Sequence, residues 1–138
     1  MPFTERTLSF LVENSLMDSR EWFHAHKEEY EKYIVDPMAE VCVAVTPTML
    51  EIDPEFLAIP KVGKSISRLW RDTRFTKDRG IFRDYVWCSF IREKYRGLPE
   101  FWFSVSPQGA EWGCGWYWTG TDTMANIREK VIPDDPGW

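Results

Sequence analysis

The sequence is poor in the residues that build covalent cross-links and metal sites. Among its 138 residues are three cysteines, Cys42, Cys88 and Cys114, and two histidines. An odd set of widely spaced cysteines is not the pattern of a disulfide framework or a zinc site, so we expect reduced thiols. His24 and His26 are two positions apart on a predicted helix and point about 200° from one another around its axis. The sequence also lacks a dinucleotide fingerprint and a Walker loop. We therefore expect no metal site and no cofactor.

Long apolar runs and an excess of basic charge are also missing. No stretch approaches eighteen apolar residues, and no basic stretch leads into an apolar run at the start of the chain. These absences predict no membrane span and no signal peptide, and we expect a cytoplasmic protein. With 17 basic and 22 acidic side chains, the net charge is −5. That balance argues against a general nucleic-acid binder, although a local basic patch leaves this function open. The oligomeric state is not encoded in any pattern that we recognise.

The chain does have enough apolar material for one core. Apolar residues make up 43% of the sequence, and aromatic residues make up 16%, including eight tryptophans. A chain of this length buries roughly two-thirds of its unfolded surface, so it folds without cross-links. We expect a single domain over residues 1–138.

The first half predicts helices. Apolar residues at helical spacing over 8–16 predict a first helix. Asp18, with Glu21 three residues later, is a candidate N-cap for a second helix. Asp36-Pro37 predicts the start of a third helix, because proline is tolerated at the first helical position. Pro47 is expected to kink or end that helix. Prolines and glycine over 51–64 then predict a connecting loop.

The second half predicts strands. Strands are expected over 65–71, 85–91, 101–105 and 112–118, with a hairpin turn over 106–109 and a last short helix over 123–131. Helices come first and strands later, so the class is α+β, with N-terminal helices packed on a mostly antiparallel sheet.

Alternation along the last predicted strand places three tryptophans, Trp112, Trp116 and Trp118, on one face. The other face carries Gly113 and Gly115, which leave it bare for the close approach of a backbone or a ligand. We expect the tryptophans to pack in the core. Exposed, they would form a platform that stacks on bases or sugars, or a surface that binds a partner protein.

The segment 68–83 could carry chemistry. It holds five arginines and one lysine against two aspartates, a local charge of +4 in a chain of net charge −5. Arginine suits bidentate binding of phosphate or carboxylate. Three interpretations stay open: an internal ion-pair network, an anion or ligand site, and solvated surface charge. The residues expected to bind an anion are Arg68, Arg71, Asp72, Arg74, Lys77, Asp78 and Arg79.

At this segment the sequence resembles a bacterial family of unknown function, DUF2461. The resemblance rests on the motif R-x-x-R-D-x-R-F-x-x-D over 68–78. After it the family pattern has Lys and, three positions on, Tyr, where this chain has Arg79 and Phe82. The run 20–23, followed by Lys27 and Tyr30, is similar to the family's N-terminal helix. Gly113-x-Gly115 and Ile127-Arg128 are similar too. Family members usually run longer, so the resemblance implies that a C-terminal segment is missing here.

The resemblance brings no established activity, so three functions stay open. The first is a cytoplasmic domain that binds a small phosphate- or carboxylate-bearing ligand through Arg68, Arg71 and Arg74. The second is a phosphoester hydrolase in which the same arginines stabilise negative charge and Asp72 or Asp78 acts as base or holds a metal. The third is an interaction module built on exposed tryptophans.

Overall fold

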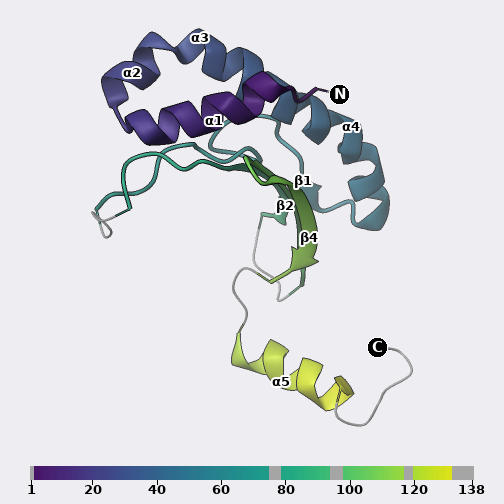
Figure 1. Cartoon of the computed structure of the whole chain (residues 1–138). Helices are drawn as coiled ribbons and strands as arrows, with labels where there is room; N and C mark the ends of the chain where they lie inside the picture. The colour runs from purple at the N-terminus through teal and green to yellow at the C-terminus, as the bar shows by residue number, and fades with distance from the viewer. Residues whose placement is uncertain (1, 75–78, 94–97, 117–119, 132–138) are drawn as a thin grey trace.

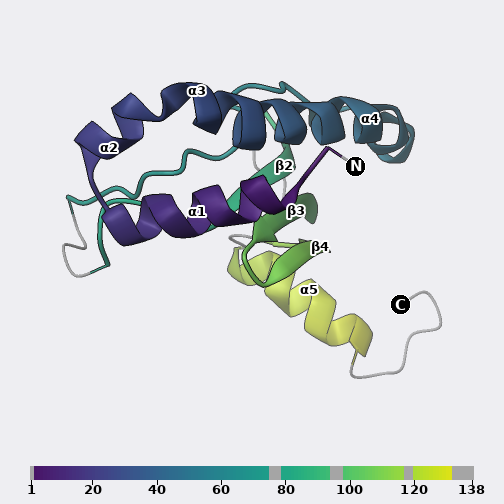
Figure 2. The ribbon, with the colours of Figure 1, turned by 45° about the horizontal axis from the view of Figure 1, so that its top comes forward.

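A computed structural model describes residues 2–74, 79–93, 98–116 and 120–131. Its N-terminal half is helical, as the periodicity predicts. Helix α1 (Glu5–Met17) is followed by α2 (Arg20–Ala25), α3 (Lys27–Tyr30), a π-helical turn (Glu31–Val35) and α4 (Asp36–Ile52). Figures 1 and 2 show that α2, α3 and α4 follow one another in one direction, while α1 runs beside them in the other. The helices therefore form one layer.

The turn between α1 and α2 differs from the prediction. Ser19, not Asp18, caps α2: its hydroxyl accepts the N–H of Trp22 at 3.2 Å. Asp18 instead ends α1 in the left-handed region, with φ of 45°. Its carboxylate accepts the N–H groups of Ile81 and Phe82, at 2.7 and 3.0 Å. The predicted cap is wrong because these two distant donors occupy the Asp18 carboxylate.

Helix α4 begins at Asp36 with Pro37 in its first turn, as predicted, but no break precedes it: the chain enters α4 directly from the π-helical turn, and Asp36 is not its N-cap. In a regular helix the carbonyl of Tyr33 would accept the N–H of residue 37, which proline lacks. The hydroxyl of Thr7, on α1, donates to that carbonyl at 2.9 Å instead. Upstream, the N–H of Asp36 donates to the carbonyl of Glu31, the wider spacing of a π-helical turn.

Pro47 does not end α4, because the helix continues to Ile52. Pro47 and Val43, whose carbonyl loses its helical donor, are both exposed. Water can therefore satisfy the carbonyl that Pro47 leaves free.

By length and composition alone, the helical run Lys27–Ile52 could cross a membrane. The core helix of a folded domain passes the same test. Four side chains of this run, Tyr30, Ile34, Met38 and Cys42, belong to the core of the chain. They recur at four-residue steps, the spacing of one buried helical face. We therefore describe the run as a core helix.

The second half forms a four-stranded antiparallel sheet in the order β1-β2-β3-β4. Its strands are β1 (Phe56–Leu57), β2 (Val86–Arg92), β3 (Glu100–Ser106) and β4 (Gly109–Gly115). The α+β class is confirmed. Three predicted strands correspond to β2, β3 and β4, and the predicted hairpin turn joins β3 to β4, where Ser106 pairs with Gly109.

Two features of the sheet differ from the prediction. The short strand β1 lies inside the predicted loop 51–64. The segment 65–71 forms only isolated bridges, in which Ile66 pairs with Cys88 and Trp70 pairs with Phe82. It pairs first with β2 and then with residues 81–83, so neither pairing extends into a regular strand.

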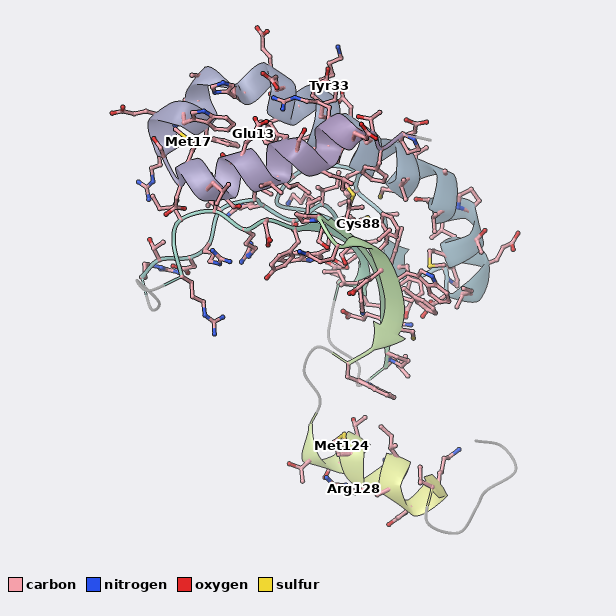
Figure 3. All side chains as sticks on the ribbon, viewed as in Figure 1. Glu13, Met17, Tyr33, Cys88, Met124 and Arg128 are labelled. Carbon is pink, nitrogen blue, oxygen red and sulfur yellow. The ribbon has the colours of Figure 1, made fainter. Side chains whose placement is uncertain are left out.

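The core lies between the helices and one face of the sheet. Strand β2 turns Val86, Cys88 and Phe90 inward against Phe10 and Leu11 of α1, among other side chains of the helices. Figure 3 shows Cys88 at this junction of helices and sheet. Burial raises the pKa of the Cys88 thiol, and the neighbouring thiol of Cys42 raises it further. Cys88 therefore stays protonated, as expected for a structural thiol.

The prediction that the tryptophans of the last strand pack in the core is wrong for Trp112, which is 81% exposed. Trp116 is 37% exposed, and Trp118 lies outside the described residues. Trp112 does lie on the inner face, but β4 is the outermost strand. An apolar gap of about 290 Å³ separates α4 from the sheet here. The inner face is therefore not fully covered at this edge.

The prediction that the two glycines leave one face of the last strand uncovered holds for Gly115 but not for Gly113. A Cβ on Gly113 would lie 2.8 Å from the ring of Trp102, so that ring covers the glycine. Gly115 has open space beside it.

Helix α5 (Thr121–Val131) begins two residues before its predicted start. Figures 1 and 3 show it beyond the end of β4, apart from the other helices, and Figure 3 labels its residues Met124 and Arg128. None of its residues is buried. Helix α5 therefore adds nothing to the core.

Candidate functional site

The Arg-rich segment is built on two short stretches that run antiparallel to one another. The N–H of Arg71 donates to the carbonyl of Ile81 at 2.7 Å, and the N–H of Arg83 donates to that of Leu69 at 2.8 Å. Gly80, with φ of 78°, adopts a backbone conformation that favours glycine. It also lets the segment lie close to the Asp18 carboxylate, because a Cβ at this position would be only 3.0 Å from it. Together with the bonds from residues 81 and 82, this contact ties the segment to the end of α1.

Arg71 fixes the segment from within. Its Nη1 donates to the carbonyl of Arg79 and, at 2.8 Å, to the carbonyl of Phe82. Nη1 makes all the hydrogen bonds found for the Arg71 side chain within the described part of the chain. Among the described residues, Arg71 is therefore oriented by backbone carbonyls and has no carboxylate partner.

Asp72 and Arg74 form a separate ion pair on the surface. The Arg74 guanidinium donates to both carboxylate oxygens of Asp72, with Nη2 2.7 Å from Oδ2. These hydrogen bonds lower the pKa of Asp72 to about 2. Both side chains are well exposed, so solvent screens the pair and it contributes little to stability.

The remaining predicted residues lie apart from this pair. Arg68 is exposed, with its guanidinium over the Trp70 ring at 5.9 Å from the centroid. Arg79 is exposed and contributes its carbonyl to Arg71. Lys77 and Asp78 lie outside the described residues.

The structure brings one predicted residue, Arg71, into a cleft between the motif segment and the α2–α3 region. The cleft has a volume of about 640 Å³, within the range of small-molecule sites. From the helical side it is lined by Arg20, Phe23, His24, Lys27, Tyr30, Glu31, Val35 and Asp36. From the other side it is lined by Val62, Trp70, Arg71, Ile81 and Phe82.

The cleft combines positive charge with an aromatic floor. Among the described lining residues, Arg20, Lys27 and Arg71 supply three cations against the carboxylates of Glu31 and Asp36, an excess of one positive charge. Arg20 is exposed and has no ion pair or hydrogen bond from its side chain to another described residue. Lys27 approaches Glu31 only to 4.0 Å. These two cations are therefore available to a ligand.

The aromatic floor is a packed cluster. The rings of Phe23 and Tyr30 lie 4.9 Å apart, and those of Phe23 and Phe82 lie 5.1 Å apart. The Tyr30 hydroxyl is buried and has no hydrogen-bond partner among the described residues. Burial, and to a smaller degree Glu31, raises the pKa of Tyr30 to about 12. The floor therefore presents neutral rings beneath the cations.

A comparison with protein families matches residues 6–138 to the family described as "Conserved hypothetical protein (DUF2461)". The chain belongs to the DUF2461 family. Searches of curated proteins and of solved structures found no match. The two stretches that resemble DUF2461, around Arg20 to Tyr30 and around Arg68 to Phe82, meet across the cleft.

Sequence reasoning missed Arg20 and Lys27 as site residues. Both belong to the stretch of the N-terminal helices that resembles DUF2461, and that resemblance could have marked them as candidates. No pattern in the sequence showed that this stretch would face Arg71.

Elsewhere in the chain, no group of three or more His, Cys, Asp or Glu among the described residues could hold a metal ion. His24 lines the cleft and is exposed, whereas His26 stacks on Trp22 with ring centroids 3.9 Å apart.

Proposed function

We propose that the DUF2461 cleft binds a small ligand that joins a phosphate or carboxylate group to an apolar part. One observation carries the proposal: Arg20, Lys27 and Arg71, from distant parts of the chain, line one cleft above an aromatic floor. Arginine and lysine are the side chains that bind phosphate and carboxylate groups, and they bind more strongly where aromatic walls exclude water.

The division of the cleft supports a ligand with two parts. Arg71 is held in place by carbonyls, so little side-chain entropy is lost when an anion binds it. Trp70, which is 39% exposed, and the half-buried Val62 and Ile81 offer apolar surface to the rest of the ligand, above the nearly buried rings of the floor. A bare inorganic anion would leave that surface in water, so an organic phosphate or carboxylate fits the cleft better.

The phosphoester hydrolase that the sequence leaves open has less support. It assigns the base to Asp72 or Asp78. Asp72 holds Arg74 at the surface and does not line the cleft. Asp78 lies outside the described residues. We therefore propose binding as the function of the cleft.

The test measures binding of phenyl phosphate by isothermal titration calorimetry, with phenol as the uncharged comparison. Phenyl phosphate should bind, and phenol should bind at least tenfold more weakly. Arg20→Ala and Lys27→Ala should each weaken the affinity for phenyl phosphate at least tenfold, because a hydrogen bond to a charged group contributes about 1.5–3 kcal/mol.

The matched control is Lys130→Ala, which removes an exposed cation from α5. It should leave the affinity for phenyl phosphate unchanged. Equal affinity for phenol and phenyl phosphate, or an equal loss in the Lys130 variant, would contradict the proposal.

A further inference from the structure

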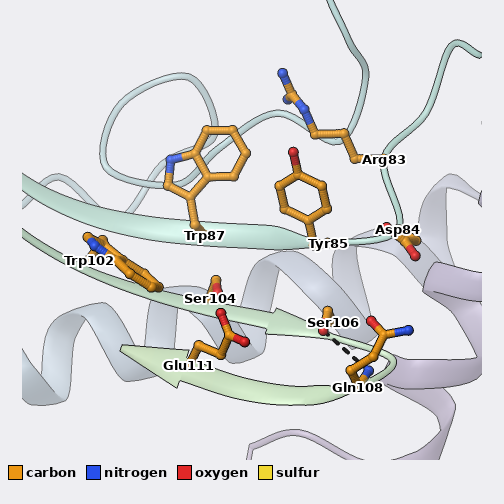
Figure 4. Close-up of a pocket in the computed structure, with 9 residues that line it drawn as sticks. All are labelled: Arg83, Asp84, Tyr85, Trp87, Trp102, Ser104, Ser106, Gln108 and Glu111. Carbon is orange, nitrogen blue, oxygen red and sulfur yellow. Dashed lines mark hydrogen bonds between the residues drawn. The ribbon is translucent and has the colours of Figure 1, made fainter. Parts of the chain in front are cut away.

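A second cavity, of about 720 Å³, opens on the outer face of the sheet, away from the helices. Figure 4 shows it over β2, β3 and β4. The register explains which side chains meet there. Trp87 pairs with Ser104, which pairs with Glu111, so these three form one row across the outer face. Trp102 lies in the next row, across from Gly113.

Three aromatic side chains dominate this cavity. The rings of Tyr85 and Trp87 are stacked, 5.8 Å apart with 27° between their planes. In Figure 4 they stand side by side above β2. Trp102 covers Gly113 and is still 39% exposed, and Tyr85 is 38% exposed. These rings lie on the face opposite the core, so burial in the core does not account for them.

The wall above Trp87 is fixed by Arg83. Its Nη1 donates to the carbonyls of Arg68 and Trp70, at 3.0 and 3.3 Å. Its guanidinium lies over the Trp87 ring, 4.9 Å from the centroid. Three contacts thus hold one side of the cavity in place before any ligand binds.

The polar groups around the aromatic rings have mixed character. In the described lining, the carboxylates of Asp84 and Glu111 outnumber the cation of Arg83, so the lining does not favour an anionic ligand. The same lining offers hydroxyls from Ser104 and Ser106. Donors and acceptors therefore alternate around an apolar surface, which matches a neutral ligand that is rich in hydroxyl groups.

We infer that this outer-face cavity is a carbohydrate-binding site. The faces of the aromatic rings carry partial negative charge and attract the C–H groups on the face of a sugar ring. Sugar hydroxyls donate to the carboxylates of Asp84 and Glu111 and accept from Arg83. A nucleotide would bring phosphate charge toward these carboxylates, so the charge balance favours a neutral sugar. The site is separate from the anion-binding cleft and does not depend on it.

The experiment is saturation-transfer difference NMR with three probes: maltotriose, cellotriose and chitotriose. At least one should receive saturation on its ring protons from the wild-type protein. Trp87→Ala and Trp102→Ala should each reduce that signal at least fivefold. Glu111→Gln, which keeps the shape of the side chain, should weaken the affinity several-fold.

The control variant is Trp112→Ala, which removes a tryptophan that is more exposed but lies on the opposite face. It should keep the full signal. Circular dichroism of each variant should match the wild type, because the substituted side chains lie outside the core. Three results would each overturn the inference: no saturation of any probe, full saturation in both outer-face variants, or saturation of adenosine in place of the sugars.

Discussion

Asp18 links the N-terminal helices to the motif segment, and its removal gives the sharpest test of that link. In Asp18→Ala, the N–H groups of Ile81 and Phe82 lose acceptors that lie at 2.7 and 3.0 Å. Hydrogen bonds to a charged group contribute about 1.5–3 kcal/mol each, and two bonds to one carboxylate are not additive. We expect a loss of about 2–4 kcal/mol in the free energy of unfolding.

The left-handed backbone at Asp18 permits a second comparison. Its φ of 45° strains alanine, whereas glycine adopts this region freely. Asp18→Gly should therefore be more stable than Asp18→Ala by about 1 kcal/mol, although both lack the carboxylate. Asp18→Asn keeps one acceptor oxygen and should lose about half as much as the alanine variant.

Urea denaturation followed by far-UV circular dichroism measures these differences, with calorimetry for the melting temperature. For a chain of this size we expect Asp18→Ala to melt roughly 10 °C below the wild type. Glu40→Ala, which removes an exposed carboxylate from α4, should stay within about 0.5 kcal/mol. If Asp18→Ala is as stable as Glu40→Ala, the carboxylate does not hold the motif segment, and our account of the segment fails.

Three further predictions follow from single contacts. Thr7→Val should lower the free energy of unfolding by about 1–3 kcal/mol in urea, because it removes the donor for the carbonyl that proline leaves free; an unchanged value would refute that role. Gly113→Ala should lower the free energy of unfolding by about 1–3 kcal/mol, because the new Cβ would lie 2.8 Å from Trp102. Gly115→Ala should be neutral or stabilising, because there is open space beside Gly115. Equal effects of the two substitutions would contradict the packing of Trp102 on Gly113. The pKa of Tyr30 is raised to about 12, so the folded state holds its proton more tightly and the free energy of unfolding should fall as pH rises from about 10 through 12, by on the order of 2–3 kcal/mol. A Tyr30→Phe variant with the same pH dependence would show that another group causes the fall.

Local patterns were sufficient to predict most of the elements. Helix α1 and strands β2 and β3 follow from apolar spacing and from β-branched and aromatic runs, which depend on neighbours in the sequence. The α+β class follows from their order. The resemblance to DUF2461, which the family match confirms, rested on the motif over 68–78 and on weaker similarities elsewhere in the chain.

The errors have causes that lie far away in the sequence. Asp36 does not cap α4 because the preceding turn is already helical, and Thr7, on another helix, donates to the carbonyl that Pro37 leaves free. Asp18 does not cap α2 because residues 81 and 82 reach its carboxylate. No local pattern contains these partners.

The candidate site was predicted only in part. The charge of the Arg-rich segment singled out Arg71, which does line the cleft. Its partners Arg20 and Lys27 depend on how the helices pack, which spacing does not reveal. Alternation placed Trp112 on the inner face but could not show that this edge of the sheet is left uncovered.

The most direct test of the proposed anion-binding function of the cleft is a titration of ¹⁵N-labelled protein with phenyl phosphate, followed by amide chemical shifts. Our account predicts that the largest shifts occur at Lys27, Ile81 and Phe82, which line the cleft. Shifts confined to Arg68 and Arg74 on the exposed part of the motif, or no shifts at saturating ligand, would contradict it.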